Sequence, residues 1–243
     1  SILVMGAAQN RLFIIHHEAA HRLLFSNRKI NDFVGIRFIG RIAFGSGSHG
    51  YRIGHIRHHR DEFGPEEPDF ILYSFYPISK SSMTRKLLRD LSGISAFRIL
   101  RPRFERLNEL RHLRLTISFL FSQLTVAALF WFFANLTMYL FLWLLPWACV
   151  YQLLNRLRAI SEHGGMTQSS DRRKTTHYVR QNRLANFFIV PFNVGYHLAH
   201  HVDMLVPYRN LPLLDQALME DGYISSDLIW PNYRSLWKAL ILK

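Results

Sequence analysis

Cysteine is almost absent from the sequence, since Cys149 is the only one among 243 residues. A single thiol cannot form an intrachain disulfide, and it cannot build a zinc site that depends on cysteine ligands. This composition is typical of a protein that faces a reducing compartment. The start of the chain also lacks the pattern of a signal peptide. Because the chain opens directly in the apolar run SILVMGAA, we expect it to lack upstream sequence.

One long segment lacks charged residues, since residues 115–155 contain no Asp, Glu, Lys or Arg. A helix crosses the roughly 30 Å hydrocarbon layer of a membrane in about 20 residues. The stretch is therefore long enough for two crossings, and the core helix of a soluble protein rarely stays uncharged for this length. We predict a transmembrane helical hairpin over 115–155 that turns near Ala134, Asn135 and Leu136.

Acidic residues are outnumbered, with 17 Asp and Glu against 30 Lys and Arg, and the net charge is +13. Basic residues flank the hairpin on both sides, whereas its turn carries none. Cationic residues collect on the cytoplasmic side, so we predict that both ends of the hairpin face the cytoplasm. The charge then indicates attraction to anionic lipid headgroups, and we expect no binding of nucleic acid. The flanking residues are Arg101, Arg103, Arg106, Arg111 and Arg114 before the hairpin, and Arg156, Arg158, Arg172, Arg173 and Lys174 after it.

Histidine is abundant by contrast, with 13 residues that fall mostly into short clusters. Two clusters share the spacing HxxHH, and on a helix the positions i, i+3 and i+4 point the same way. Imidazole suits Zn, Cu, Fe and Ni, and one ion would leave ligands over, so we predict a two-metal site. The hairpin returns to the side that it left, which keeps all clusters on one face of the membrane. The clusters are His16, His17 and His21; His55, His58 and His59; His197, His200 and His201; and the single His163 in RAISEHGG.

The remaining histidines have a simpler interpretation. A lone histidine on an apolar face is usually a packed core residue, and we expect this of His49, His112 and His177. His16 is ambiguous, because it neighbours His17 but points away from the face that His17 and His21 share.

The ordered histidine motifs resemble those of the membrane fatty acid desaturase superfamily, the histidine-box di-iron enzymes. The matching stretches are HHEAAHRLLFSNRKINDFVG, YRIGHIRHHRDEFGPEEPDF, RAISEHGG and FNVGYHLAHHVDMLVPYRNLPLL. The resemblance implies an all-α fold, an integral membrane helical bundle under a cytosolic helical cap that carries the histidine clusters, with N-terminal span(s) missing here. It also implies nine iron ligands, which are His17, His21, His55, His58, His59, His163, His197, His200 and His201.

The resemblance divides the chain into four parts. Residues 1–25 are the end of a membrane span and the first histidine box, and residues 26–114 are a cytosolic or interfacial region with the second box. Residues 115–155 form the transmembrane hairpin, and residues 156–243 form the cytosolic cap with His163 and the third box. We expect a multi-pass membrane protein with its histidines on the cytoplasmic side.

Carboxylates orient histidine ligands by accepting the proton of the other ring nitrogen. Among the acids in or beside the clusters we favour Glu18, Glu162 and Asp69 for this role, and Asp61 and Asp203 are further candidates. The implied cofactors are two iron ions, with O2 as co-substrate. No HPGG haem motif is present, so we expect a separate electron donor of the ferredoxin or cytochrome b5 type.

The resemblance implies an O2-dependent fatty acid desaturase that acts on an acyl-lipid, acyl-CoA or acyl-ACP and contacts membrane lipids. The stretch PYRNLP after the third cluster is typical of fatty-acid enzymes and favours desaturation. The alternative within the superfamily is a hydroxylase or ketolase of lipids or carotenoids. A remoter alternative is a non-enzymatic, histidine-rich metal-binding membrane protein. The latter would place ligands within the spans, and residues 115–155 contain no histidine.

Overall fold

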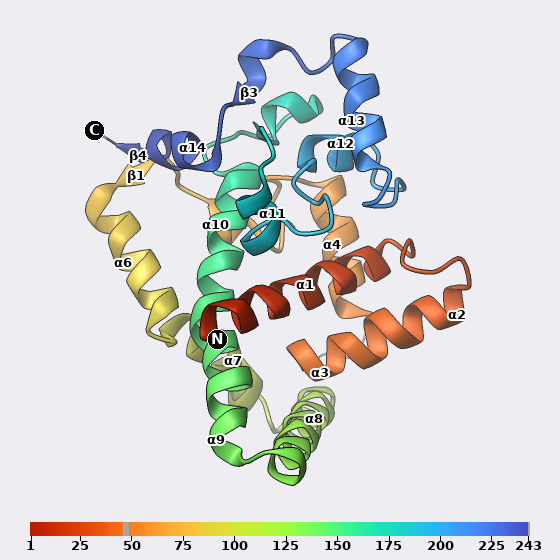
Figure 1. The fold of residues 1–243 in the computed structure, drawn as a ribbon, viewed down its shortest axis with the longest axis vertical. Helices are drawn as coiled ribbons and strands as arrows, with labels where there is room; N and C mark the ends of the chain where they lie inside the picture. The colour runs from red at the N-terminus through yellow and green to blue at the C-terminus, as the bar shows by residue number, and fades with distance from the viewer. Residues whose placement is uncertain (46–48, 243) are drawn as a thin grey trace. The chain divides into compact units, whose positions relative to one another are not determined.

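The computed structural model describes residues 1–45 and 49–242, and these residues are mostly helical (Figure 1). The chain separates into two compact units, each made of two segments. The first unit comprises residues 1–51 and 86–154, and the second comprises residues 52–85 and 155–243. The described residues contain four strands of two residues each, so the prediction of a helical protein is confirmed with this small addition.

The first unit is built from helices alone in its described residues. It contains α1 (Ile2–Ala20), α2 (Arg28–Asn31), the π-helix η1 (Asp32–Ile39), α3 (Gly40–Phe44), α7 (Ile94–Glu105), α8 (Leu110–Phe133), α9 (Leu136–Tyr139), and the π-helices η2 (Leu140–Leu144) and η3 (Pro146–Tyr151). Three helices carry the chain from one unit into the other, namely α4 (Gly50–Arg60), α6 (Lys80–Leu91) and α10 (Gln152–His163).

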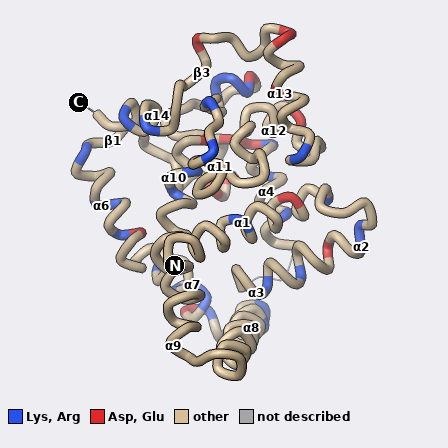
Figure 2. The backbone as a smooth tube through the Cα atoms, viewed as in Figure 1, with Lys and Arg blue, Asp and Glu red and all other residues tan. Residues whose placement is uncertain are grey.

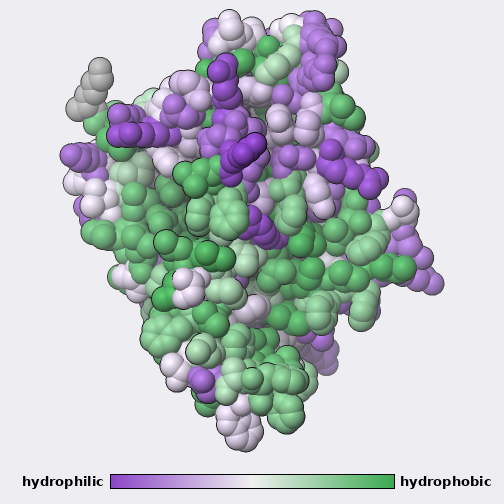
Figure 3. All heavy atoms as spheres, in the orientation of Figure 1, coloured by the Kyte–Doolittle hydropathy of each residue, from purple (hydrophilic) through white to green (hydrophobic). Residues whose placement is uncertain are grey.

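Two helical stretches are long and apolar enough to cross a membrane, as judged by length and composition. One is α8, with 24 residues, and the other runs for 28 residues from Leu136 to His163. Only 17% of the most apolar 18-residue segment of α8 is buried, and only 22% of the corresponding segment of the second stretch is buried. A soluble core helix would bury most of its apolar surface. Hydrophobic residues also dominate the surface over α8 and α9 in the face that Figure 3 shows.

Glycines allow α1 to pack closely within the first unit. A Cβ atom on Gly6 would lie 2.4 Å from Cγ1 of Val150 on η3, and one on Gly35 of η1 would lie 2.0 Å from Cβ of Ala19. Any side chain at either position would force the helices apart.

The chain leaves α1 through a turn that Asn31 holds in place. The buried Asn31 donates from Nδ2 to the carbonyl of Ala19 at 2.9 Å and accepts from the backbone N–H of Leu24 at 3.1 Å. These contacts fix the C-terminal end of α1, where the first histidine cluster lies.

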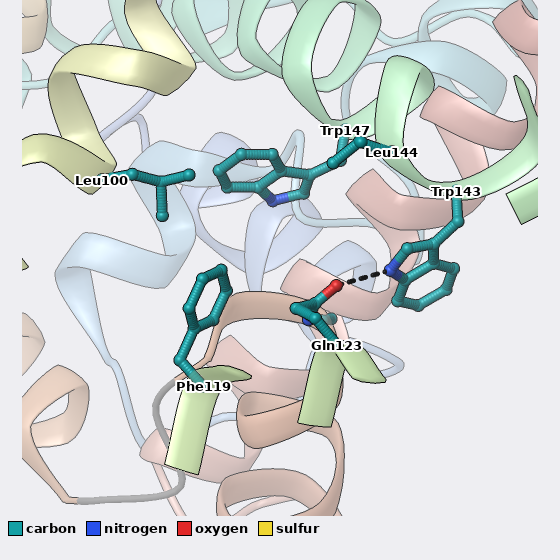
Figure 4. Close-up of a pocket in the computed structure, with 7 residues that line it drawn as sticks. Leu100, Phe119, Gln123, Trp143, Leu144 and Trp147 are labelled. Carbon is teal, nitrogen blue, oxygen red and sulfur yellow. Dashed lines mark hydrogen bonds between the residues drawn. The ribbon is translucent and has the colours of Figure 1, made fainter. Parts of the chain in front are cut away.

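Polar side chains join the two long helices to their neighbours inside the first unit (Figure 4). Oε1 of Gln123 on α8 accepts from Nε1 of Trp143 on η2 at 3.1 Å, and its Nε2 donates to the carbonyl of Ile42 at 3.0 Å. A polar side chain among apolar neighbours needs such partners, because burial without a hydrogen bond is costly. The small cavity beside this pair, which Trp147 also lines, has a volume of about 40 Å³, room for about one water molecule.

The second unit contains short helices and all four strands. They are α5 (Phe70–Tyr73), β1 (Ile78–Ser79), the 3-10 helix η4 (Arg172–Lys174), β2 (Tyr178–Val179), α11 (Arg183–Phe188), α12 (His197–Val202), α13 (Leu211–Glu220), the 3-10 helix η5 (Ser226–Leu228), β3 (Ile229–Trp230), α14 (Tyr233–Ala239) and β4 (Ile241–Leu242).

The C-terminal segment of the second unit braces the helices that carry histidines. Strand β1 pairs in parallel with β4, and β2 pairs in parallel with β3. Tyr178, Leu198 and Ile224 form a buried apolar cluster, which packs β2 against α12. Nε1 of Trp237 on α14 donates to Oγ of Ser161 at 2.7 Å, close to the end of α10. Residues far apart in the sequence therefore hold α10 and α12 in place.

Candidate metal centre

Seven buried histidines from three helices gather within the second unit. Each HxxHH motif occupies one short helix, so the spacing i, i+3 and i+4 turns its three rings to the same side. A tight packing of imidazoles at this depth needs a partner that compensates for lost hydration. The seven are His55, His58 and His59 on α4, His163 at the end of α10, and His197, His200 and His201 on α12.

Four of these histidines form one group, made of His58, His163, His197 and His201. Each offers one ring nitrogen, and the four nitrogens lie within 4.8 Å of one another. The Nε2 atoms of His163 and His197 are 3.1 Å apart, and the rings of His163 and His201 have centroids 4.8 Å apart. Three separate helices therefore supply one compact set of nitrogen ligands.

The other three histidines, His55, His59 and His200, form a second group beside the first. Their ligand nitrogens also lie within 4.8 Å of one another. The Nε2 atoms of His55 and His59 are 3.1 Å apart, and the rings of His59 and His200 have centroids 4.7 Å apart. The alternation within HxxHH sends His58 to one group and His59 to the other, so that α4 serves both.

The outward ring nitrogens of several histidines are held by oxygen acceptors. Nδ1 of His163 donates to the carbonyl of Thr175 at 2.8 Å, and Nδ1 of His58 lies 3.0 and 2.9 Å from the two oxygens of Glu67. Nδ1 of His201 contacts Glu62. A proton fixed on Nδ1 leaves the lone pair of Nε2 available to a metal. Nε2 of His201 is buried, and no hydrogen-bond partner for it exists among the described residues.

Burial keeps the imidazoles in the form that binds metals. Loss of hydration lowers the pKa of His197 and of His201 well below the usual range, and the neighbouring histidines lower it further. His58 differs, because burial alone would lower its pKa, whereas the hydrogen bond and charge of Glu67 outweigh burial and raise it. The lowered pKa of His197 and His201, the Nδ1 atoms held by oxygen acceptors and the buried Nε2 of His201 fit a site of imidazole-bound metal ions.

Glu62 and Glu67 are functional candidates beyond those predicted from the sequence. Both follow the second histidine motif, and both are buried. Glu62 also accepts a salt bridge from Arg172 at 3.0 Å, and the same guanidinium donates to the carbonyl of His59 at 2.8 Å. The signal available in the sequence is the run of acids directly after HxxHH in HIRHHRDEFGPEEPD.

The acids that the sequence favours lie in different surroundings. An oxygen of Glu162 is 3.6 Å from Nδ1 of His197 and 3.6 Å from Nε of Arg158. Asp69 lies close enough to His58 and Glu67 to share a ligand group with them, and its backbone N–H donates to Glu67 at 2.9 Å. Burial raises the pKa of Asp69. Glu18 is buried on α1 in the first unit.

Asp61 and Asp203 take part in turns. Oδ2 of Asp61 accepts from the backbone N–H of Glu66 at 3.4 Å, and Oδ1 of Asp203 accepts from that of Leu205 at 2.9 Å. These are the local bonds with which aspartate stabilises chain reversals.

His17 and His21 belong to the first unit. Both are buried at the C-terminal end of α1, and their ring centroids are 4.9 Å apart. His16 lies on another side of α1, where its Nδ1 donates to the carbonyl of Gly35 at 2.8 Å and its ring packs against Tyr51. That bond gives His16 a structural role inside the first unit.

The lone histidines fit the expectation only in part. His177 is half-buried and donates from Nε2 to the carbonyl of Gly164 at 2.7 Å, which packs it against the end of α10. The prediction is wrong for His49, which is exposed, whereas His112 is half-buried and lies 3.4 Å from an oxygen of Glu109.

The fold and the site define a helical protein with a dense, buried histidine cluster suited to metal ions. The model of the fatty acid desaturase family matches residues 1–232, and the chain belongs to that family. It is also similar to dihydrorhizobitoxine desaturase of Bradyrhizobium elkanii, with 26% identity over 251 residues, covering 95% of this chain and 70% of that protein. No solved structure matches the chain significantly. The family resemblance that the histidine motifs indicate is thus confirmed.

Proposed function

We propose that this chain is a membrane-bound, O2-dependent di-iron desaturase that inserts a double bond into an acyl chain. The observation that supports the proposal most directly is the buried set of seven histidines, in two groups, within the second unit. We include His17 and His21 as the remaining two ligands because their HxxxH motif takes the first place in the order of the family's motifs. The proposal places α8 and the helix that follows it in the membrane, with the histidines on the cytoplasmic side.

The chemistry that two bound iron ions supply is the activation of O2, which permits removal of two hydrogens from adjacent methylene carbons. The protein's own residues prepare the site. Glu67 and the carbonyl of Thr175 hold the protons on Nδ1 of His58 and His163, so that both rings present Nε2. Burial of all seven rings excludes water from the site. A separate donor of the ferredoxin or cytochrome b5 type supplies the electrons in this proposal.

The proposal also names a class of substrate. We favour an acyl-lipid, acyl-CoA or acyl-ACP because the family model is that of fatty acid desaturases. The curated relative is named for dihydrorhizobitoxine and not for a fatty acid, which makes that compound a second candidate substrate. A hydroxylase or ketolase would share the metal site, and the product alone distinguishes these reactions.

The test is expression in a host of known lipid composition, with mapping of double bonds in the extracted lipids and a parallel culture fed dihydrorhizobitoxine. Loss of two hydrogens from the product supports desaturation, and gain of one oxygen supports hydroxylation. His58→Ala should abolish the product and lower the iron content from two ions per chain, while the protein stays in the membrane fraction. His112→Ala is the matched control, because His112 is half-buried on α8 and belongs to none of the histidine groups. Full activity of His58→Ala would refute the ligand assignment.

A further inference from the structure

A groove in the first unit combines guanidinium groups with aromatic rings. Arg37 of η1 and Arg41 of α3 line it on one side, and Phe121 and Thr125 of α8 line it on the other. Its volume is about 410 Å³, within the range of about 300–1,000 Å³ that small-molecule sites occupy. The groove thus borders a helix that is long and apolar enough to cross a membrane.

The two guanidinium groups lack an acidic partner. Arg37 and Arg41 are both exposed, and in residues 1–45 and 49–242 neither forms a salt bridge with a carboxylate. Basic residues recur along the segment from α2 to α3 (Figure 2). Arginine presents a planar fork of donors that matches the oxygens of a phosphate, which makes an anion the complementary ligand.

The same groove has aromatic walls that an ion alone would leave in contact with solvent. Phe33 is 63% exposed, Phe38 is 56% exposed and Phe121 is 68% exposed. Large apolar side chains gathered at one exposed place mark an interaction surface. The ligand should therefore carry an apolar part beside its anionic part.

We propose that this groove binds one anionic phospholipid, with its phosphate on Arg37 and Arg41 and its acyl chain along Phe121 and Thr125. The inference rests on the proposed membrane location of α8. Near an anionic membrane surface each basic residue contributes about a fivefold increase in binding. Because two such residues line the groove, an anionic headgroup should bind more tightly there than elsewhere on the basic surface.

The experiment measures binding of dioctanoyl phosphatidylglycerol to the detergent-solubilised full chain by native mass spectrometry. Dioctanoyl phosphatidylcholine tests the acyl chains without net charge, and inorganic phosphate tests the anion without chains. We expect one tightly bound phosphatidylglycerol per chain, weakened about 25-fold in Arg37→Gln/Arg41→Gln. Thr125→Trp keeps both charges but fills the groove, and it should weaken binding at least tenfold.

The matched control is Arg111→Gln/Arg114→Gln, which removes the same charge at the start of α8 outside the groove. Equal weakening in both double variants would mean diffuse attraction and would overturn the site. Equal binding of phosphatidylcholine, or displacement by inorganic phosphate alone, would overturn it as well. Iron content and product formation, measured on the same preparations, report on the proposed function separately. A chain that needs no detergent to stay in solution would contradict the membrane proposal itself.

Discussion

Glu66 and Glu67 are adjacent glutamates, but their surroundings predict that the same substitution has an effect at Glu67 and none at Glu66. Both oxygens of Glu67 lie at 3.0 and 2.9 Å from Nδ1 of His58, and the side chain is fully buried. Glu66 is 59% exposed and forms long ion pairs, at 3.5 Å to Arg57 and 3.7 Å to Arg60. Replacement of Glu67 should disturb the metal site, and replacement of Glu66 should not.

The expected magnitude follows from the hydrogen bond that is lost. A hydrogen bond to a charged group contributes about 1.5–3 kcal/mol, which corresponds to a factor of about 10–100. Loss of an outer partner of a metal-bound histidine costs about 10–100-fold in metal affinity or activity. Glu67→Ala should reach this range, whereas Glu67→Gln keeps one acceptor for His58 and should lose less.

The assay is iron content after purification together with the rate of product formation, for Glu67→Ala, Glu67→Gln and Glu66→Gln. Glu66→Gln should match the wild type in both quantities, because surface ion pairs contribute about 0–1 kcal/mol. If Glu67→Ala retains its iron and its rate, Glu67 does not orient a ligand, and the assignment of His58 to the site loses its structural support.

Three further outcomes are expected. Burial raises the pKa of Asp215 to about 6, above its unfolded value of about 3.9. The folded state therefore holds the proton more tightly, and stability falls as the pH rises from about 4 to about 6. Asp215→Asn should raise the thermal midpoint at pH 7.5 but barely at pH 4, and an equal rise at both would contradict this. Gly6→Ala should destabilise the fold by about 1–3 kcal/mol in denaturant unfolding, because its Cβ would meet Val150 at 2.4 Å, and Val150→Ala should restore most of the loss. Removal of iron by a chelator should lower the thermal midpoint, and added iron should restore it; an unchanged midpoint would argue against bound metal.

The sequence predicts those features that depend on local spacing. The charge-free run of 115–155 predicts two long apolar helices, and the structure contains them, separated by Ala134 and Asn135. The spacing HxxHH predicts three rings on one side of a helix, and α4 and α12 present them in this way. Such patterns are visible because helix geometry alone relates the residues.

Contacts that depend on the path of the chain in three dimensions could not be predicted from the sequence. Asp61 and Glu62 are neighbours, yet Asp61 stabilises a turn and Glu62 contacts His201. Nothing in the sequence distinguishes them, because the direction of each side chain is set where α4 ends at Arg60. The sequence also cannot indicate that the carbonyl of Thr175 accepts from His163, since every residue has a backbone carbonyl.

The buried charges of the second unit give an independent reason to expect a cationic occupant. Glu62 and Glu67 are buried, Glu162 is 12% exposed, and Asp69 adds a fourth carboxylate nearby. Arg172 contacts Glu62, Arg158 contacts Glu162 and His58 contacts Glu67. Burial of an unpaired charge costs several kcal/mol per ion. Metal cations bound to the Nε2 atoms of the histidines would add positive charge beside these carboxylates. The outer acids and the inner histidines would then be parts of one electrostatic arrangement that bound metal cations stabilise.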